Sequence, residues 1–202
     1  MHGSVVVKYD SLKDKAESIV DILNGQQIYS LMYDEKRNIL VAGTTFYADG
    51  FIQKPIADKV YLMTISVEPF GLLHAYEMPK GYKFAGVFGK KDEDTYLVYL
   101  VTAERSYEVS HVAEFSLAHP EKGLTNVTEY KNKAIHVYAA RTTCDLNAYI
   151  ACENNVVKKF TFTDGKFKTL KEYKTDGVVI NWFYQDGEVF VITRKNIYIF
   201  DY

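Results

Sequence analysis

Hydrophobic and polar residues alternate along most of the chain, in short segments that end at residues typical of turns. An alternation with a period of two residues is typical of a β-strand with one buried face. In the first group of segments, the polar residues 34–38 and the Pro-Phe-Gly turn at 69–71 each separate two segments. The four strands expected in this group are residues 28–33, 39–42, 59–66 and 72–78. Because turns join most of them, we expect one antiparallel unit.

The same order of segments then returns three times, and the last group has three segments in place of four. The strands expected in these groups are residues 82–88, 95–101, 109–116 and 125–130, then 135–139, 148–151, 156–162 and 167–173, and finally 178–184, 188–192 and 197–200. The groups start about 45 to 55 residues apart, which is the spacing of propeller blades. We therefore expect one domain, residues 1–202, with repeat units at about 27–79, 80–130, 131–175 and 176–202.

Residues 1–26 allow two interpretations. By comparison with the third repeat unit, residues 5–9 and 17–23 are two strands that complete or precede a blade. By the rules for helix ends, Ser11 is a helix N-cap with Asp14 three residues later, and Asn24-Gly25 is a stop signal. In that helix, one face would hold Leu12, Ala16, Ile19, Val20 and Leu23. We favour the two strands.

A four-stranded unit of this size buries little surface alone, and radial stacking of several units covers their faces. In this architecture the chain resembles the β-propellers of the WD-repeat-like superfamily over nearly its whole length. The Gly-His and Trp-Asp dipeptides of WD repeats are absent, since the single tryptophan, Trp182, precedes Phe183. We expect an all-β fold, a β-propeller of about four four-stranded antiparallel blades, as a closed small ring or an incomplete ring that needs a partner. A β-sandwich or barrel is the fallback.

Composition fits this expectation and narrows the class of protein. The chain is 48% hydrophobic and 25% charged, as is typical of a globular protein, and its 17 tyrosines and 12 phenylalanines favour strands. The formal net charge of −2 provides no global attraction for nucleic acid. The sequence shows neither a signal peptide nor a membrane-spanning run, so we expect a cytoplasmic or nuclear protein. Cys144 and Cys152 fit neither a disulfide scaffold nor a usual zinc spacing.

No motif for catalysis, a metal or a cofactor emerges, and we expect no catalytic residues, no metal site and no cofactor. The five histidines lack partners at metal-ligand or catalytic spacing. Acidic residues stand mostly at turns, and the Asp-Gly pairs at 164–165, 176–177 and 186–187 supply the geometry of tight hairpins. One alternative remains, in which His74, His111 and His136 meet carboxylates around a propeller channel and form the active site of a hydrolase or lyase.

Two segments are candidates for binding partners. Lysines alternate with aromatic residues near the end of the third repeat, and the candidates there are Lys158, Lys159, Lys166 and Lys168. They suit RNA or an acidic peptide, or they protect an exposed strand edge from aggregation. The long loop 44–58 carries the apolar candidates Phe46, Tyr47, Phe51 and Ile52. These residues either bind a partner or pack over the propeller.

Together these patterns predict a non-catalytic protein–protein interaction scaffold, which presents propeller loops and blade edges within a macromolecular complex. This prediction rests partly on what folds of this kind often do. Other protein subunits are the expected partners. We expect no association with a membrane, and we infer no small-molecule substrate. The alternatives are the propeller-type hydrolase or lyase and a factor associated with RNA or ribonucleoprotein through the local basic face.

Overall fold

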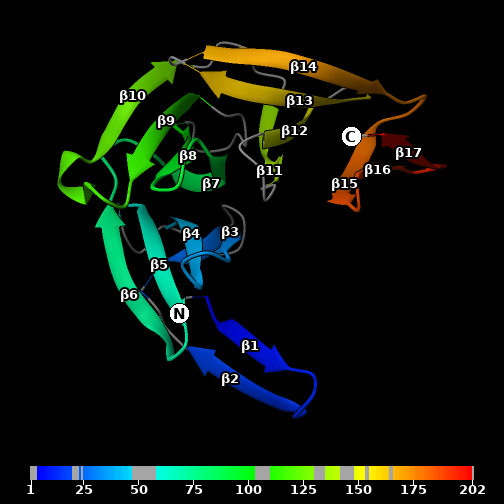
Figure 1. Cartoon of the computed structure of the whole chain (residues 1–202). Helices are drawn as coiled ribbons and strands as arrows, with labels where there is room; N and C mark the ends of the chain where they lie inside the picture. Colours follow the sequence, from blue (N-terminus) through cyan, green and yellow to red (C-terminus); the bar gives the residue numbers. More distant parts are fainter. Residues whose placement is uncertain are drawn as a thin grey trace. The chain divides into compact units, whose positions relative to one another are not determined.

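The computed structural model describes residues 4–19, 23, 25–46, 58–102, 110–129, 135–141, 148–152, 155–163 and 166–201. These residues form the strands β1 to β17 and one short 3-10 helix, and no α-helix occurs among them. The fold is therefore all-β, as expected. The chain divides into two compact units, Met1–Val87 with Thr102–Arg105 and Phe88–Val101 with Ser106–Tyr202. Figure 1 shows the strands of each unit in the colours of the sequence.

The first unit contains the first four-stranded group expected from the sequence. Its antiparallel strands follow one another in chain order, β3 (Gln27–Asp34), β4 (Ile39–Thr45), β5 (Tyr61–Val67) and β6 (Phe70–Glu77). The next strand, β7 (Phe84–Lys90), begins beside β4, where Phe84 lies opposite Thr45. The expected hairpins are therefore confirmed for this group.

Gly43 allows β7 to approach β4 closely. A Cβ atom at this position would lie 2.2 Å from the carbonyl oxygen of Ala85 and 2.4 Å from the Cα of Gly86. Both distances are far below van der Waals contact, and both neighbours are backbone atoms that cannot rotate away. Only glycine fits at this point of the sheet.

The N-terminal segment forms a hairpin of two strands, β1 (Val6–Asp10) and β2 (Lys15–Ile19). Two strands therefore form here, as expected, although the second covers residues 15–19 and not 17–23, and the helical alternative is wrong over residues 11–19. Residues 20–22 and 24 lie outside the described residues. The side chain of Asp10 accepts hydrogen bonds from the backbone N–H groups of Leu12 and Lys13. Asp14 adopts a positive φ of 49°. These local features close a turn at the position where a helix would have to begin.

Packing also favours the hairpin over the helix. Val6 of β1 is buried together with Ala42, Met63 and Ile65 of the adjacent sheet, and Ile19 of β2 packs against this cluster. Lys8 donates a 2.9 Å hydrogen bond to the carbonyl oxygen of Val67 and also pairs with Glu68. The hairpin is therefore held to the β3–β6 sheet by an apolar core and by an ion pair at its surface.

The second unit contains the remaining groups in the expected order. From the end of β7, neighbouring strands pair in the order β7, β8 (Thr95–Val101), β9 (His111–Ser116) and β10 (Leu124–Glu129). A second sheet contains β11 (Ile135–Arg141), β12 (Ala148–Cys152), β13 (Val156–Thr163) and β14 (Lys166–Lys174). The third has the three strands β15 (Val179–Gln185), β16 (Glu188–Thr193) and β17 (Ile197–Asp201). All pairs within the last two sheets are antiparallel.

One of the predicted Asp-Gly hairpins is visible in full. Asp186 and Gly187 join β15 to β16 and have positive φ angles of 50° and 86°. Two consecutive positive φ angles are the signature of the turn that matches the twist of antiparallel strands. The pair at 164–165 lies outside the described residues.

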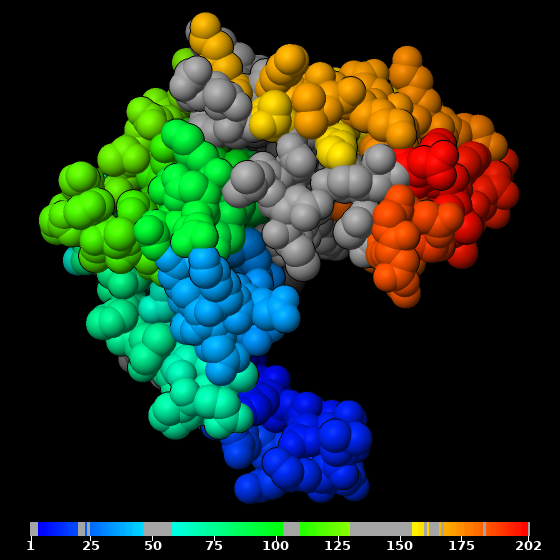
Figure 2. Space-filling view, viewed as in Figure 1, coloured from blue at the N-terminus to red at the C-terminus, as the bar shows by residue number. Residues whose placement is uncertain are grey.

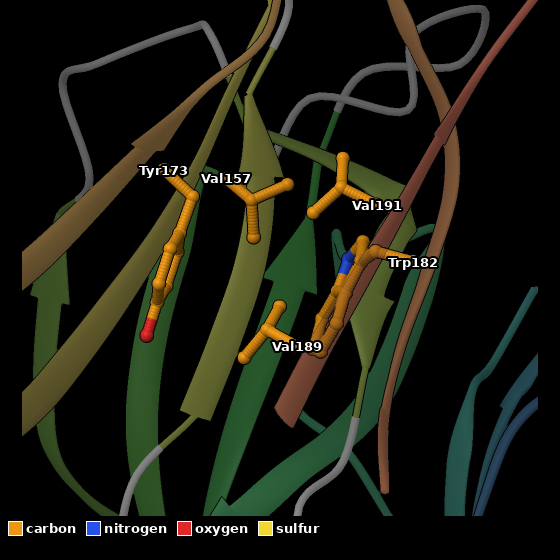
Figure 3. Packing of buried hydrophobic residues seen from close by; sticks show 5 residues of the cluster. All are labelled: Val157, Tyr173, Trp182, Val189 and Val191. Atoms are coloured by element: carbon orange, nitrogen blue, oxygen red, sulfur yellow. The ribbon is translucent and has the colours of Figure 1, made fainter. Parts of the chain in front are cut away.

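A hydrophobic cluster joins two sheets of the second unit. Val157 of β13 and Tyr173 of β14 are buried with Trp182, Val189 and Val191 of the β15–β16 hairpin (Figure 3). Trp182 is 3% exposed, so almost the whole indole lies within this core. The cluster buries one face of the β15–β17 sheet, and it therefore decides which face of this sheet stays exposed.

Candidate interaction surfaces

The β15–β17 sheet exposes apolar residues on the face opposite to this core. Across the three strands, Phe183 lies opposite Phe190, which lies opposite Ile199. The rings of Phe183 and Phe190 stack with centroids 4.7 Å apart and planes 5° apart. Ile197 and Ile199 are 67% and 57% exposed. We call Phe183, Phe190, Ile197 and Ile199 the apolar face.

The sequence explains why this sheet is apolar on both faces. In β15 the neighbours Trp182 and Phe183 point to opposite sides, because side chains alternate along a strand. Trp182 enters the core, and Phe183 stays 42% exposed. Val178 and Ile180, at the start of the same segment, are 63% and 58% exposed. Isolated exposed apolar residues are normal, but a contiguous group on one sheet is typical of a binding surface.

The sequence pattern alone does not single out this face. It predicts the three strands, but it does not show which side of the sheet a neighbour covers. A usable signal was present, because residues 178–184 contain apolar residues at both odd and even positions. A strand that is apolar on both sides requires cover on both sides.

The structure divides the four candidate lysines between two faces of the β13–β14 hairpin. Lys158 lies opposite Glu172, and the two side chains form an ion pair of 3.2 Å. Lys159 lies on the other face, opposite Lys171. Lys168 lies opposite Thr161, on the same face as Lys159. Lys166, two residues before Lys168, lies opposite Thr163 on this face as well. Lys166 and Lys168 are exposed, whereas Lys158 and Lys159 are half-buried.

A β-bulge brings the exposed lysines to this face. The register of β14 shifts between the pair Lys159–Lys171 and the pair Phe160–Thr169, so one extra residue, Leu170, is inserted. Without the bulge, Lys168 and Lys171 would point to opposite sides, since they stand three positions apart and side chains alternate along a strand. The bulge therefore places Lys166, Lys168 and Lys171 on one face of β14.

Of the four loop candidates, only Phe46 lies within the described residues. Phe46 is 2% exposed, and the ammonium group of Lys83 lies 5.3 Å from its ring centroid. Its side chain therefore lies inside the first unit and not on a surface. The other three candidates, Tyr47, Phe51 and Ile52, lie outside the described residues.

The histidines of the enzyme alternative lie on separate strands. His74 is exposed on β6, with its ring centroid 5.8 Å from that of Tyr76. His111 begins β9, and its Nδ1 lies 3.2 Å from the hydroxyl oxygen of Ser110. The side chain of His136 lies outside the described part of the chain. Among the described residues, no group of three His, Cys, Asp or Glu side chains could hold a metal ion.

The most buried acidic side chains have partners within the fold. Glu114 is 5% exposed and lies 2.9 Å from the ammonium group of Lys91 and 3.0 Å from the amide of Asn126. Asp34 is 4% exposed and lies 3.1 Å from the guanidinium of Arg37. Buried charges with such partners are typical of structural ion pairs. We assign neither acid a catalytic role.

The N-terminal hairpin borders a polar hollow of about 500 Å³. Its charged lining residues include Lys8, Asp10 and Glu68, which are engaged in ion pairs. The hydrogen bond from Lys8, followed by its positive charge, lowers the pKa of Glu68 below the ordinary 4.5. These contacts stabilise the hairpin and give no indication of a ligand.

Comparison with solved structures shows the kind of fold. A functionally unknown protein from Desulfotomaculum acetoxidans matches with a TM-score of 0.58 and 11% identity, over 98% of this chain and 59% of that chain. Hsv2 from Kluyveromyces marxianus, a seven-bladed propeller, matches with a TM-score of 0.50 and 12% identity, over 86% of this chain and 45% of that chain. The fold is propeller-like.

A third similar structure is an enzyme, the glutaminyl cyclase of Myxococcus xanthus. It matches with a TM-score of 0.51 and 12% identity, over 85% of this chain and 64% of that chain. The chain thus spans less than two thirds of each of these three structures. At such identities the likeness shows the fold alone.

The comparisons by sequence give no family. No protein-family model matches the chain, and no curated protein matches it. In the described residues, no helix has both the length and the apolar character needed to cross a membrane.

Proposed function

We propose that this chain is a non-catalytic protein–protein interaction module of a macromolecular complex, and that it binds a protein subunit through the apolar face of β15–β17. One observation carries the proposal, which is the stacked pair Phe183–Phe190 beside the strongly exposed Ile197 and Ile199. Aromatic and aliphatic side chains gathered on one surface are typical of the central part of a protein interface.

The support of this surface by paired strands favours the proposal. Three paired strands hold the apolar face, and the buried Trp182 anchors the sheet from behind. A surface fixed in advance loses little conformational entropy when it binds. Another protein can therefore cover it at small cost, in the way that one sheet packs on another.

The test compares two double substitutions. Ile197→Glu with Ile199→Glu places two charges on the apolar face. Leu73→Glu with Val127→Glu is the matched control, because Leu73 and Val127 are 48% and 47% exposed and lie outside the β15–β17 sheet, on β6 and β10. Each tagged chain is used to isolate partners from native lysate, and the partner is then purified and titrated against each variant.

We expect the control to bind like the unchanged chain and the apolar-face variant to bind at least about 30-fold more weakly, as for the loss of an interface hot spot. A partner that binds both variants equally well would contradict the proposal. The hydrolase or lyase alternative stays a prediction, because it depends partly on His136, whose side chain is not described.

A further inference from the structure

β14 is one of the two edge strands of its sheet and is exposed along most of its length. In the described residues it pairs with β13 alone, and it is the longest strand, with nine residues. Tyr173 is buried, whereas Lys166, Lys168 and Lys174 are exposed. The outer edge of such a strand presents N–H and C=O groups that can pair with a further strand.

The charges along β14 are mostly positive. β14 contains four lysines, Lys166, Lys168, Lys171 and Lys174, and one acid, Glu172. Glu172 lies on the face opposite to Lys171 and pairs there with Lys158. The face that holds Lys166, Lys168 and Lys171 therefore has no acid from β14 itself. Lys171 also donates a 2.6 Å hydrogen bond to the carbonyl oxygen of Asp201, which fixes one end of this row.

We propose that the β14 edge binds an extended acidic segment of a protein partner, which adds to the sheet as a further strand. Side chains on one face of a strand recur about every 6.8 Å, so acidic residues at alternate positions of the segment match Lys166 and Lys168. Opposite charges on adjacent strands attract, whereas a neutral strand would have to cover the lysines without compensation. The lysines thus disfavour unspecific pairing of this edge with other strands and favour pairing with an acidic strand.

The geometry favours a peptide over a nucleic acid. A nucleic acid would use the lysines but not the strand edge, and it would gain from aromatic side chains between the lysines. On this face Thr161 lies opposite Lys168, and Tyr173 is buried in the core. This inference rests on the proposed function, since it also treats the chain as a protein-binding module, but it concerns a different surface.

The test measures binding of labelled probes to the full chain by fluorescence anisotropy. The main probe is a peptide of alternating glutamate and threonine with the length of β14. A second peptide carries proline in place of each threonine, which keeps the charge but removes N–H groups needed for strand pairing. An oligouridylate of equal charge represents nucleic acid. Hydrogen exchange then reports which backbone amides the bound peptide protects.

Two charge reversals are compared. Lys166→Glu with Lys168→Glu changes the row on β14, and Lys122→Glu with Lys195→Glu makes the same change at exposed positions elsewhere. Lys166→Gln with Lys168→Gln is a milder second variant, and thermal unfolding checks that each variant keeps its fold. We expect both β14 variants to weaken peptide binding, the reversal by at least about 10-fold, and the control to change it less than about 2-fold.

The remaining outcomes decide between mechanisms. The proline peptide should bind at least about 10-fold more weakly than the threonine peptide, and residues of β14 should gain protection from exchange. Equal binding of the proline peptide, absence of protection in β14, or tighter binding of the oligouridylate would each overturn the inference. Peptide binding should survive Ile197→Glu with Ile199→Glu, so failure here is distinguishable from failure of the proposed function.

Discussion

Single residues decide how closely the strands of the first unit can approach. Gly43 stands where a Cβ would meet the carbonyl oxygen of Ala85 at 2.2 Å, so Gly43→Ala forces β4 and β7 apart. We expect this substitution to lower the free energy of unfolding by about 1–3 kcal/mol, the usual cost of overpacking.

Urea unfolding followed by circular dichroism measures this effect. Gly71→Ala is the matched control, because a Cβ at Gly71 would have no atom within 4 Å. The control should change the free energy of unfolding by less than about 0.5 kcal/mol. Equal stabilities of the two variants would show that β7 does not lie against β4 as described.

Adjacent aromatic residues in β15 should have opposite roles. Trp182→Ala removes a side chain that is 3% exposed, and it should cost about 3–5 kcal/mol of stability. Phe183→Ala removes a side chain that is 42% exposed, and it should cost clearly less stability while it weakens partner binding. Thermal unfolding and binding of the purified partner separate the two effects. A larger stability loss for Phe183→Ala would reverse the assignment of the faces.

The candidate lysines show what the sequence can predict for a residue and what it cannot. Alternation along β13 is enough to place Lys158 and Lys159 on opposite faces, since neighbours in a strand always diverge. It does not place Lys168 beside Lys171, because that depends on the bulge at Leu170. A bulge arises from the packing of the whole hairpin and has no sure signal in one sequence.

Among the elements, the N-terminal hairpin is the one that local rules left open. Its residues satisfy both a capped helix and a pair of strands, and the choice depends on the apolar surface that Val6 and Ile19 cover. Tertiary packing overrides local propensity in such a case. Elsewhere the strands follow from short alternating or apolar segments that end at turn residues.

The ion pair of this hairpin should make its docking sensitive to acid. The hydrogen bond from Lys8 lowers the pKa of Glu68 in the folded chain, so Glu68 contributes stability above its ordinary pKa of 4.5. This contribution is lost as the pH falls through the lower folded pKa. We expect amides of β1 and β2 to lose protection from hydrogen exchange between about pH 6 and about pH 3, after correction for intrinsic rates.

Glu68→Gln provides the control for this prediction. It removes the carboxylate, so the hairpin should be less protected at about pH 6 and should change little on acidification. Glu77→Gln alters another exposed carboxylate, which pairs with Lys59, and it should leave the hairpin's pH dependence intact. An unchanged pH response in Glu68→Gln would show that the Lys8–Glu68 pair does not hold the hairpin.

For the whole molecule, the order of strands could be predicted and the exposed surfaces could not. The repetition along the chain predicts the order of the strands, and β11–β14 and β15–β17 form sheets of four and three strands, with β1 and β2 as a separate pair. Exposure depends on which sheet covers which face, as Trp182 and Phe183 illustrate. Neither the apolar face nor the burial of Phe46 follows from alternation alone.

The measurement that tests the central claim most directly is site-specific photocross-linking in cells. A photoreactive amino acid at position 199 lies on the apolar face, and the same amino acid at position 127 lies on an exposed position of β10. We predict a defined cross-linked protein from position 199, absent from position 127 and lost when Ile197→Glu is added. Identical cross-links from both positions, or none from position 199, would contradict it.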